Sequence, residues 1–171
     1  MPEKTLLQAD YILTWDEGLK LFSQGEMVIE DSLITYLGPR LERPAENFDR
    51  IIDGKNSLVI PGFVNTHTHA AMTLFRGYAD DLSLMDWLQN KIWPAEAKLK
   101  KEDIYWGTLL AIAEMLKGGT TCFADMYFHM EEAARACQES GIRASLSQGL
   151  VGLDKTKGAL GLRQSRSLVQ N

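Results

Sequence analysis

Short apolar strands alternate with helices in the second part of the chain, and this alternation restricts the fold more than any other feature. Three apolar segments of strand length are separated by stretches with helical patterning. The expected strands lie within residues 58–66, 121–126 and 143–150, and the expected longer helices over 102–117 and 131–139. Strands that alternate with helices along a chain form a parallel sheet covered by helices. The sequence therefore predicts an α/β fold, of which these are the opening repeats.

A short helix is expected between the first and second of these strands. Ser83 and Asp86 have the spacing of a capping box, and the helix should continue to about Ile92. Pro94 would then stop it, because proline lacks the backbone donor that a helix interior needs. Glu96 would consequently lie in a loop.

The first part of the chain has a different pattern. Segments rich in β-branched and aromatic residues stand between turn residues, and strands are expected over 6–14, 26–30, 32–37 and 50–52, the middle two as a hairpin. Residues 4–53 contain neither histidine nor cysteine. We therefore expect a small β-scaffold without a cluster of catalytic type.

Composition and charge exclude several classes of protein. Of the 171 residues, 45% are hydrophobic and 24% charged, as in soluble globular proteins. The net charge of −5 and the absence of a basic stripe argue against nucleic-acid binding. No apolar run approaches the ~20 residues that cross a bilayer, and the first residues lack a signal-peptide core. Cys122 and Cys137 form no disulfide framework, which predicts reduced thiols in a cytoplasmic protein.

The first apolar strand, residues 58–64, leads into the sequence His67-Thr68-His69. Side chains alternate across a strand, so both imidazoles are expected on the same face. Neutral imidazole nitrogens bind zinc or iron at ~2.0–2.1 Å, and such a metal can lower the pKa of a bound water towards ~7. A lone histidine is more often structural, but a pair at this spacing is a stronger indication of metal binding. Two histidines are still an incomplete site.

A few other residues are candidates for the same region. Asp125 and His129 lie at or just beyond the end of the second strand and are considered as residues lining a site, although both also suit ordinary loop or capping roles. Glu96 and Arg76, taken alone, have the pattern of solvated surface charges.

Five stretches of the sequence form a recognisable set of motifs: Pro61 to His69, Thr73 to Asp81, Trp87-Leu88, Trp93 to Glu96, and Gly118 to Tyr127. Together they resemble the amidohydrolase superfamily, and within it most closely the 5-methylthioadenosine/S-adenosylhomocysteine deaminases, neighbours of the triazine hydrolases. The resemblance covers about residues 5 to 152, and the basic tail after it is not matched.

The resemblance implies a (β/α)₈ barrel flanked by a β-sandwich. Residues 1–57 would be the N-terminal portion of that sandwich, and residues 58–171 the first three β/α units of the barrel. A barrel of this kind takes ~250 residues, so the barrel in this chain is expected to be incomplete.

The resemblance also assigns roles to four residues. His67 and His69 would hold a divalent metal, a single Zn²⁺ by analogy with the family, and Glu96 would contact the substrate through ribose hydroxyls. Gln148 stands where relatives often carry an arginine that reaches the substrate; glutamine keeps hydrogen bonding but loses the charge. The acid/base glutamate and the further metal ligands are expected beyond Asn171, so no catalytic residue is assigned within the chain.

The implied activity is hydrolytic deamination of adenosine-type nucleosides, which gives an inosine-type product and ammonia. The expected partner is a small-molecule nucleoside, with no nucleic acid and no membrane, and an oligomer is compatible with the sequence. The isolated chain is expected to be inactive. Two alternatives stay open: another amidohydrolase, such as a triazine, guanine or cytosine hydrolase, or a truncated remnant without catalysis that folds poorly or binds a metal or a partner.

Overall fold

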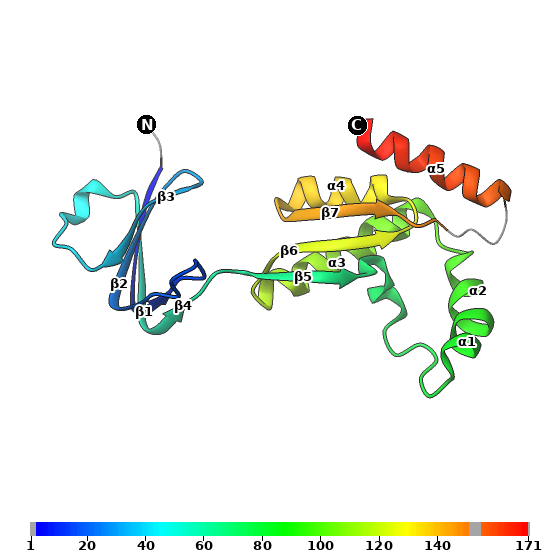
Figure 1. Ribbon diagram of the computed structural model, residues 1–171, viewed down its shortest axis with the longest axis horizontal. Coiled ribbons are helices and arrows are strands. Elements are labelled where there is room, and N and C mark those ends of the chain that lie inside the picture. The colour runs from blue at the N-terminus through cyan, green and yellow to red at the C-terminus, as the bar shows by residue number, and fades with distance from the viewer. Residues whose placement is uncertain (1–2, 151–154, 171) are drawn as a thin grey trace. The chain divides into compact units, whose positions relative to one another are not determined.

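The computed structural model describes residues 3–150 and 155–170, and the chain divides into two compact units (Figure 1). The first unit comprises Met1–Pro61 and the second Gly62–Asn171. The division thus falls between Pro61 and Gly62, whereas the sequence analysis places the boundary between residues 57 and 58. No helix among the described residues is long and apolar enough to span a bilayer.

The first unit is a four-stranded sheet with the strand order β3-β2-β1-β4. β1 pairs antiparallel with β2 and parallel with β4, and β2 and β3 form the expected hairpin. The turn of this hairpin contains Asp31 in the left-handed region, with φ of 52°, a conformation that aspartate adopts more readily than most residues. All four predicted strands are therefore confirmed: β1 Lys4–Leu13, β2 Leu21–Glu30, β3 Leu33–Pro39 and β4 Arg50–Val59.

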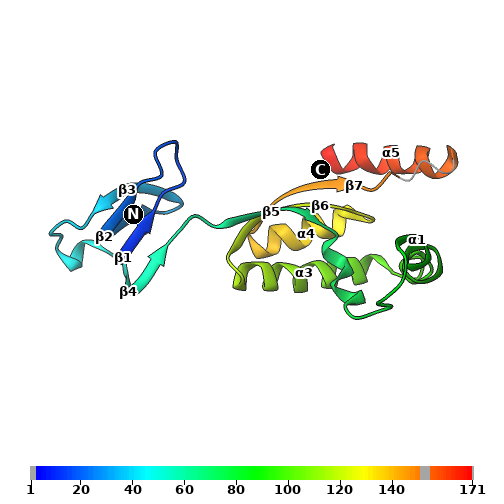
Figure 2. The same ribbon diagram turned by 60° about the horizontal axis from the view of Figure 1, so that its bottom comes forward.

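The second unit contains the predicted parallel sheet. Its strands lie in the order β5-β6-β7, and each neighbouring pair is parallel. The two helices that alternate with these strands lie on one side of the sheet (Figure 2), and Ile112 and Ala136 from the helices form a buried core with Phe123 of the sheet. The elements are β5 Phe63–Thr68, α3 Lys101–Lys117, β6 Thr120–Tyr127, α4 Met130–Ser140 and β7 Arg143–Gln148. The chain therefore has the α/β fold of the opening part of a barrel, which the described residues do not close.

The apolar run 58–64 is not one strand: its first two residues end β4, and the strand that leads to the histidines, β5, begins at Phe63. Leu58 pairs with Tyr11 at the end of β4, whereas Phe63 begins β5 in the other sheet. Pro61 and Gly62 separate the two strands. Val64 is 61% exposed, because helices cover only one face of the three-stranded sheet. An apolar run can therefore serve two sheets in succession, which hydropathy alone does not reveal.

The helical segment before α3 extends beyond the predicted stop at Pro94, which was wrong. Ser83 caps the segment as predicted, its hydroxyl accepting a hydrogen bond from the Asp86 amide at 3.3 Å. Pro94 lies in the first turn of α2, where no intrahelical donor is needed. Glu96 therefore ends a helix instead of lying in a loop. The segment consists of α1 Leu84–Trp87, the π-helical η3 Leu88–Ile92 and α2 Trp93–Glu96.

Three further elements complete the description. The 3₁₀ helix η1 spans Ala45–Asn47, and the 3₁₀ helix η2 spans Ala70–Phe75, directly after His69. The tail forms α5, Lys155–Gln170.

Gly107 allows α3 to pack closely against η2. A Cβ atom added at this residue would lie 2.7 Å from the Ala71 carbonyl oxygen and 3.0 Å from the Ala71 Cα, both of which are backbone atoms. At Gly158 in α5, an added Cβ would meet no heavy atom of the described residues within 4 Å. The two glycines form a matched pair, because both lie inside helices.

We expect Gly107→Ala to destabilise the chain by about 1–3 kcal/mol, since neither backbone atom can move without displacing η2. Gly158→Ala should instead stabilise the chain, by up to about 1 kcal/mol, through the lower backbone entropy of alanine in the unfolded chain. Urea unfolding followed by circular dichroism measures both changes. Equal stability of the two variants would contradict the close packing of α3 on η2.

Candidate metal and substrate site

The two histidines lie together at the carboxyl end of β5. Their ring centroids are 5.4 Å apart and the rings are nearly perpendicular, at 84°. Both line a hollow of about 270 Å³ whose walls come from all three strands of the parallel sheet. The prediction that the two side chains reach one site is therefore consistent with the fold, in which parallel strands bring their carboxyl ends to one edge of the sheet. The residues bordering the hollow are Thr66, His67, Thr68, His69, Ala124, Asp125, Met126, Ser145 and Ser147.

The ring of His69 is oriented by the backbone of the neighbouring strand. Its Nδ1 lies 2.7 Å from the carbonyl oxygen of Met126. A carbonyl oxygen only accepts hydrogen bonds, so Nδ1 carries the proton and Nε2 keeps its lone pair. Metal-binding histidines commonly have such a partner on the other ring nitrogen, which fixes both tautomer and orientation. His69 is thus held in the form that a metal requires.

The end of β5 departs from regular pairing just before His69. Between the pairs Asn65–Phe123 and Thr68–Asp125, β5 advances by three residues while β6 advances by two. Such a bulge changes which way the following side chains point. The simple alternation used to place both imidazoles on one face therefore does not describe this segment, although the two rings do lie close together.

Two side-chain hydrogen bonds secure this irregular segment to β6. The Thr68 hydroxyl donates to the Ala124 carbonyl oxygen at 2.7 Å. The Ala70 amide donates to Oδ1 of Asp125 at 3.1 Å. Asp125 is only 4% exposed, and its burial raises the pKa of the carboxyl group above the usual value. Asp125 therefore borders the hollow, which is the role that the sequence analysis considered for it. Its Oδ1 also fixes the backbone immediately after His69 through the Ala70 amide.

Glu96 is held by a residue that the sequence analysis did not single out. The Tyr127 hydroxyl donates to Oε1 of Glu96 at 2.7 Å. Tyr127 ends β6, is 4% exposed, and its ring centroid lies 6.3 Å from that of His69. Burial, together with the Glu96 carboxylate, raises the pKa of Tyr127 well above its ordinary value, so the phenol stays protonated. No motif spacing distinguishes this tyrosine. The one signal in the sequence is its position at the end of the second strand, two residues after Asp125, which places it near the candidate site.

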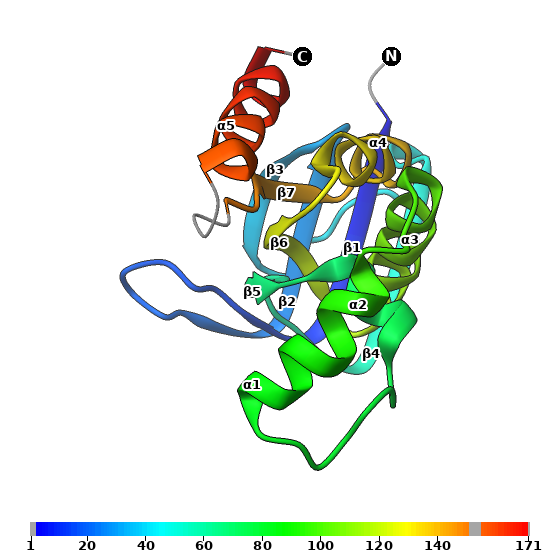
Figure 3. The same ribbon diagram turned by 90° about the vertical axis from the view of Figure 1, so that its right-hand side faces the viewer.

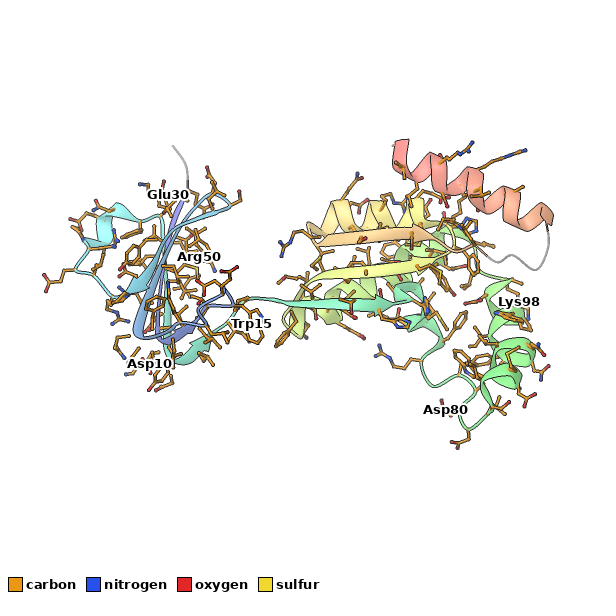
Figure 4. The ribbon with its side chains drawn as sticks, in the orientation of Figure 1. Asp10, Trp15, Glu30, Arg50, Asp80 and Lys98 are labelled. Atoms are coloured by element: carbon orange, nitrogen blue, oxygen red, sulfur yellow. The ribbon has the colours of Figure 1, made fainter. Side chains whose placement is uncertain are left out.

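The helix that carries Glu96 approaches the carboxyl ends of the strands. Figure 3 looks onto these ends, with α2 beside them. Figure 4 draws the side chains and labels Lys98, just beyond α2, and Asp80, in the loop that leads to α1. The hydrogen bond from Tyr127 is thus a direct connection between the sheet and the α1–α2 segment.

Glu96 and Tyr127 do not border this hollow, and neither do the remaining candidates, which make other contacts. Gln148 is 7% exposed, and its Oε1 accepts a hydrogen bond from the Met130 amide at 3.5 Å, at the start of α4. His129 immediately precedes α4, with Nδ1 3.7 Å from a carboxylate oxygen of Glu131. Arg76 forms two hydrogen bonds with Glu114, of 2.9 and 2.6 Å.

The two imidazoles fit a metal as part of its donor set. They converge from one strand end, and His69 presents a free Nε2. Over residues 3–150 and 155–170, no group of three or more histidine, cysteine, aspartate or glutamate side chains is placed to hold an ion. The described residues therefore offer two candidate nitrogen ligands, fewer than the three protein ligands of a typical catalytic zinc site.

Comparison with known proteins identifies the family. The sequence model described as "Amidohydrolase family" matches residues 58–168, which is more than half of the chain. The chain belongs to the amidohydrolase family. This match continues past residue 152, so the family pattern includes most of α5, which the resemblance noted in the sequence had left unmatched.

Individual amidohydrolases of known name are similar over most of the chain. A 5'-deoxyadenosine deaminase of Methanosarcina acetivorans is 54% identical over 166 residues, 96% of this chain and 38% of the relative. A 5-methylthioadenosine/S-adenosylhomocysteine deaminase of Syntrophomonas wolfei is 62% identical over 130 residues, 76% of this chain and 30% of the relative. The chain thus spans less than two fifths of the length of these two relatives.

A solved structure of a deaminase is also similar to this chain. The adenosine deaminase of Xanthomonas campestris, determined with bound zinc, superimposes with a TM-score of 0.68 at 37% identity. The match covers 84% of this chain and 34% of that protein. This amidohydrolase chain therefore shares the fold of the corresponding part of a zinc-containing deaminase.

The role of Asp125 can be tested with two substitutions. Asp125→Ala should destabilise the chain by about 1–3 kcal/mol, because the buried Ala70 amide loses its acceptor. Asp125→Asn retains an acceptor oxygen and should stay close to the unsubstituted chain. Urea unfolding compares the variants; an asparagine variant as unstable as the alanine variant would show that the carboxylate charge, and not the hydrogen bond, is what stabilises this segment.

Proposed function

We propose that the chain is the N-terminal part of a metal-dependent hydrolytic deaminase of adenosine-type nucleosides. The substrates would be 5-methylthioadenosine and S-adenosylhomocysteine or close analogues such as 5'-deoxyadenosine, and the products ammonia and an inosine-type nucleoside. One observation carries the proposal: His69 is fixed by Met126 with Nε2 free, beside His67, in a chain 54–62% identical to named deaminases. The presence of zinc in the Xanthomonas deaminase supports the metal.

In this proposal His67 and His69 hold the metal, a single Zn²⁺. When bound, such an ion supplies Lewis acidity and can lower the pKa of a water molecule towards ~7. The backbone carbonyl of Met126 keeps the His69 tautomer, and Asp125 keeps the backbone after His69 in place. The acid/base group and the further ligands are proposed to come from residues beyond Asn171, so this chain would be inactive alone.

Substrate recognition is proposed for Glu96 and Gln148. The Glu96 carboxylate accepts hydrogen bonds, which suits the hydroxyl groups of a ribose. Gln148 offers an uncharged amide in place of the arginine of relatives, and one of its atoms already contacts the Met130 amide. We further propose that the protein is cytoplasmic. Its partner would be a small-molecule nucleoside, with neither nucleic acid nor membrane bound.

Metal binding can be measured on the chain itself with Co²⁺, whose absorption spectrum reports on its ligands. We expect His67→Ala and His69→Ala each to weaken binding about tenfold or more, since each removes one of two nitrogen ligands. His129→Asn is the matched control, because asparagine tolerates the left-handed backbone found there, with φ of 52°. Loss of Co²⁺ binding in the control but not in the other variants would refute the assignment.

Substrate choice separates the proposal from its alternatives. The complete protein carrying this chain should release ammonia from 5-methylthioadenosine, S-adenosylhomocysteine or 5'-deoxyadenosine, and the isolated 171-residue chain with added zinc should not. Activity confined to guanine, cytosine or melamine-type triazines would support another amidohydrolase. A complete protein inactive on all of these compounds would favour a remnant without catalysis.

A further inference from the structure

Tyr127 connects the rigid centre of the sheet with the segment that carries Glu96. It belongs to β6, the middle strand, which pairs with β5 on one side and with β7 on the other. Its backbone carbonyl accepts a hydrogen bond from the Gly149 amide at 2.7 Å, and its ring is buried beside Phe128, with centroids 5.2 Å apart. The hydroxyl at the far end of this fixed ring reaches Glu96.

Glu96, by contrast, has little support of its own. It ends α2, a helix of four residues that follows a π-helical turn. Ile92 of this segment is buried, but the side chain of Trp93, closer to Glu96, is 41% exposed. A glutamate on a short surface helix samples several rotamers, and holding it in one of them costs conformational entropy. The Tyr127 hydrogen bond restricts this freedom before a ligand arrives.

The hydrogen bond from Tyr127 leaves other acceptor sites of the Glu96 carboxylate open to a ligand. Tyr127 donates to Oε1 of Glu96. A carboxylate has about four lone-pair sites on its two oxygens, so Oε2 can still accept from a ligand hydroxyl. The tyrosine therefore orients the carboxylate without competing for all of its acceptor sites.

We propose that Tyr127 is a positioning residue, which holds the Glu96 carboxylate in the orientation that accepts hydrogen bonds from sugar hydroxyl groups of the substrate. This inference rests on the proposed function of Glu96, but the contact itself can be tested without catalysis. Because a positioned acceptor lowers the cost of binding, loss of the tyrosine hydroxyl should weaken substrate binding more than it slows chemistry.

Tyr105 provides a matched control. It is 8% exposed, against 4% for Tyr127, and its hydroxyl likewise donates to a glutamate, Glu139, on α4. The Tyr127 ring lies beside His69, with centroids 6.3 Å apart, whereas the Tyr105 ring packs against Trp106, with centroids 4.9 Å apart. Tyr105→Phe and Tyr127→Phe thus remove the same kind of hydrogen bond from two buried tyrosines, of which only Tyr127 is beside a candidate metal ligand.

The first measurement is hydrogen–deuterium exchange of residues 88–99 in the 171-residue chain. Tyr127→Phe should raise exchange in this segment about tenfold, the size expected for one lost hydrogen bond to a charged group. Tyr105→Phe should leave the segment unchanged. Circular dichroism verifies that both variants are folded. Unchanged exchange in Tyr127→Phe would overturn the positioning role, whatever the protein catalyses.

The second measurement is the kinetics of the complete protein on two nucleosides. With adenosine, Tyr127→Phe should raise KM about tenfold while kcat changes little; with 2',3'-dideoxyadenosine, which differs only by lacking the 2' and 3' hydroxyls, KM should not change. In a Glu96→Ala background the tyrosine substitution should have no further effect on KM. Equal effects on both nucleosides would overturn the link to the hydroxyl groups. A wild-type protein that deaminates no nucleoside would overturn that link and the proposed function, while the exchange result would still decide the Tyr127–Glu96 contact.

Discussion

The site depends on how the carboxyl end of β5 is fastened to β6. Regular ladder pairing fails there, since β5 carries an extra residue between Asn65 and Thr68. Side-chain hydrogen bonds take over from the ladder: Thr68 to the Ala124 carbonyl and the Ala70 amide to Asp125. Because both bonds flank His69 in the sequence, the backbone at this histidine is fixed on either side. A metal ligand at a strand end requires this kind of support, since a shift of a fraction of an ångström changes its geometry.

Three consecutive residues of β6 contribute to the site in three different ways. Asp125 uses its carboxylate, Met126 its backbone carbonyl and Tyr127 its hydroxyl. The strand pleat explains this division. Asp125 and Tyr127 lie on the helix-covered face and are buried, whereas the Met126 side chain is 46% exposed on the other face. One short segment therefore positions His69 and Glu96 simultaneously, although these residues belong to separate elements 27 positions apart.

The sequence predicted which helices and strands form more accurately than the residues at which they begin and end. Alternating apolar strands and helices were sufficient for the parallel sheet, because each segment has one dominant periodicity. Pro94 was misjudged because a proline in the first turn of a helix and one that ends a helix look alike in sequence. The run 58–64 is divided between two strands, because Pro61 and Gly62 interrupt it.

The candidate site was predictable only in part, for a similar reason. A local motif is enough to select His67 and His69 as candidate metal ligands, because a His-x-His pair at a strand end is typical of metal binding. Tyr127 could not be found in this way, because its role depends on a residue 31 positions earlier in the chain. The contact of the Met126 carbonyl with His69 could not be predicted either, because every residue has a backbone carbonyl and the residue type does not reveal which one is used.

Gln148, proposed to contact the substrate, also contributes to the fold. Its amide oxygen accepts from the Met130 amide, one of the first N–H groups of α4, which have no partner inside the helix. An arginine has donors only and could not accept this hydrogen bond. Glutamine thus provides an acceptor at the start of α4 without bringing a charge. Among the residues proposed to contact the substrate, this leaves the Glu96 carboxylate as the charged group, and its orientation is set by Tyr127.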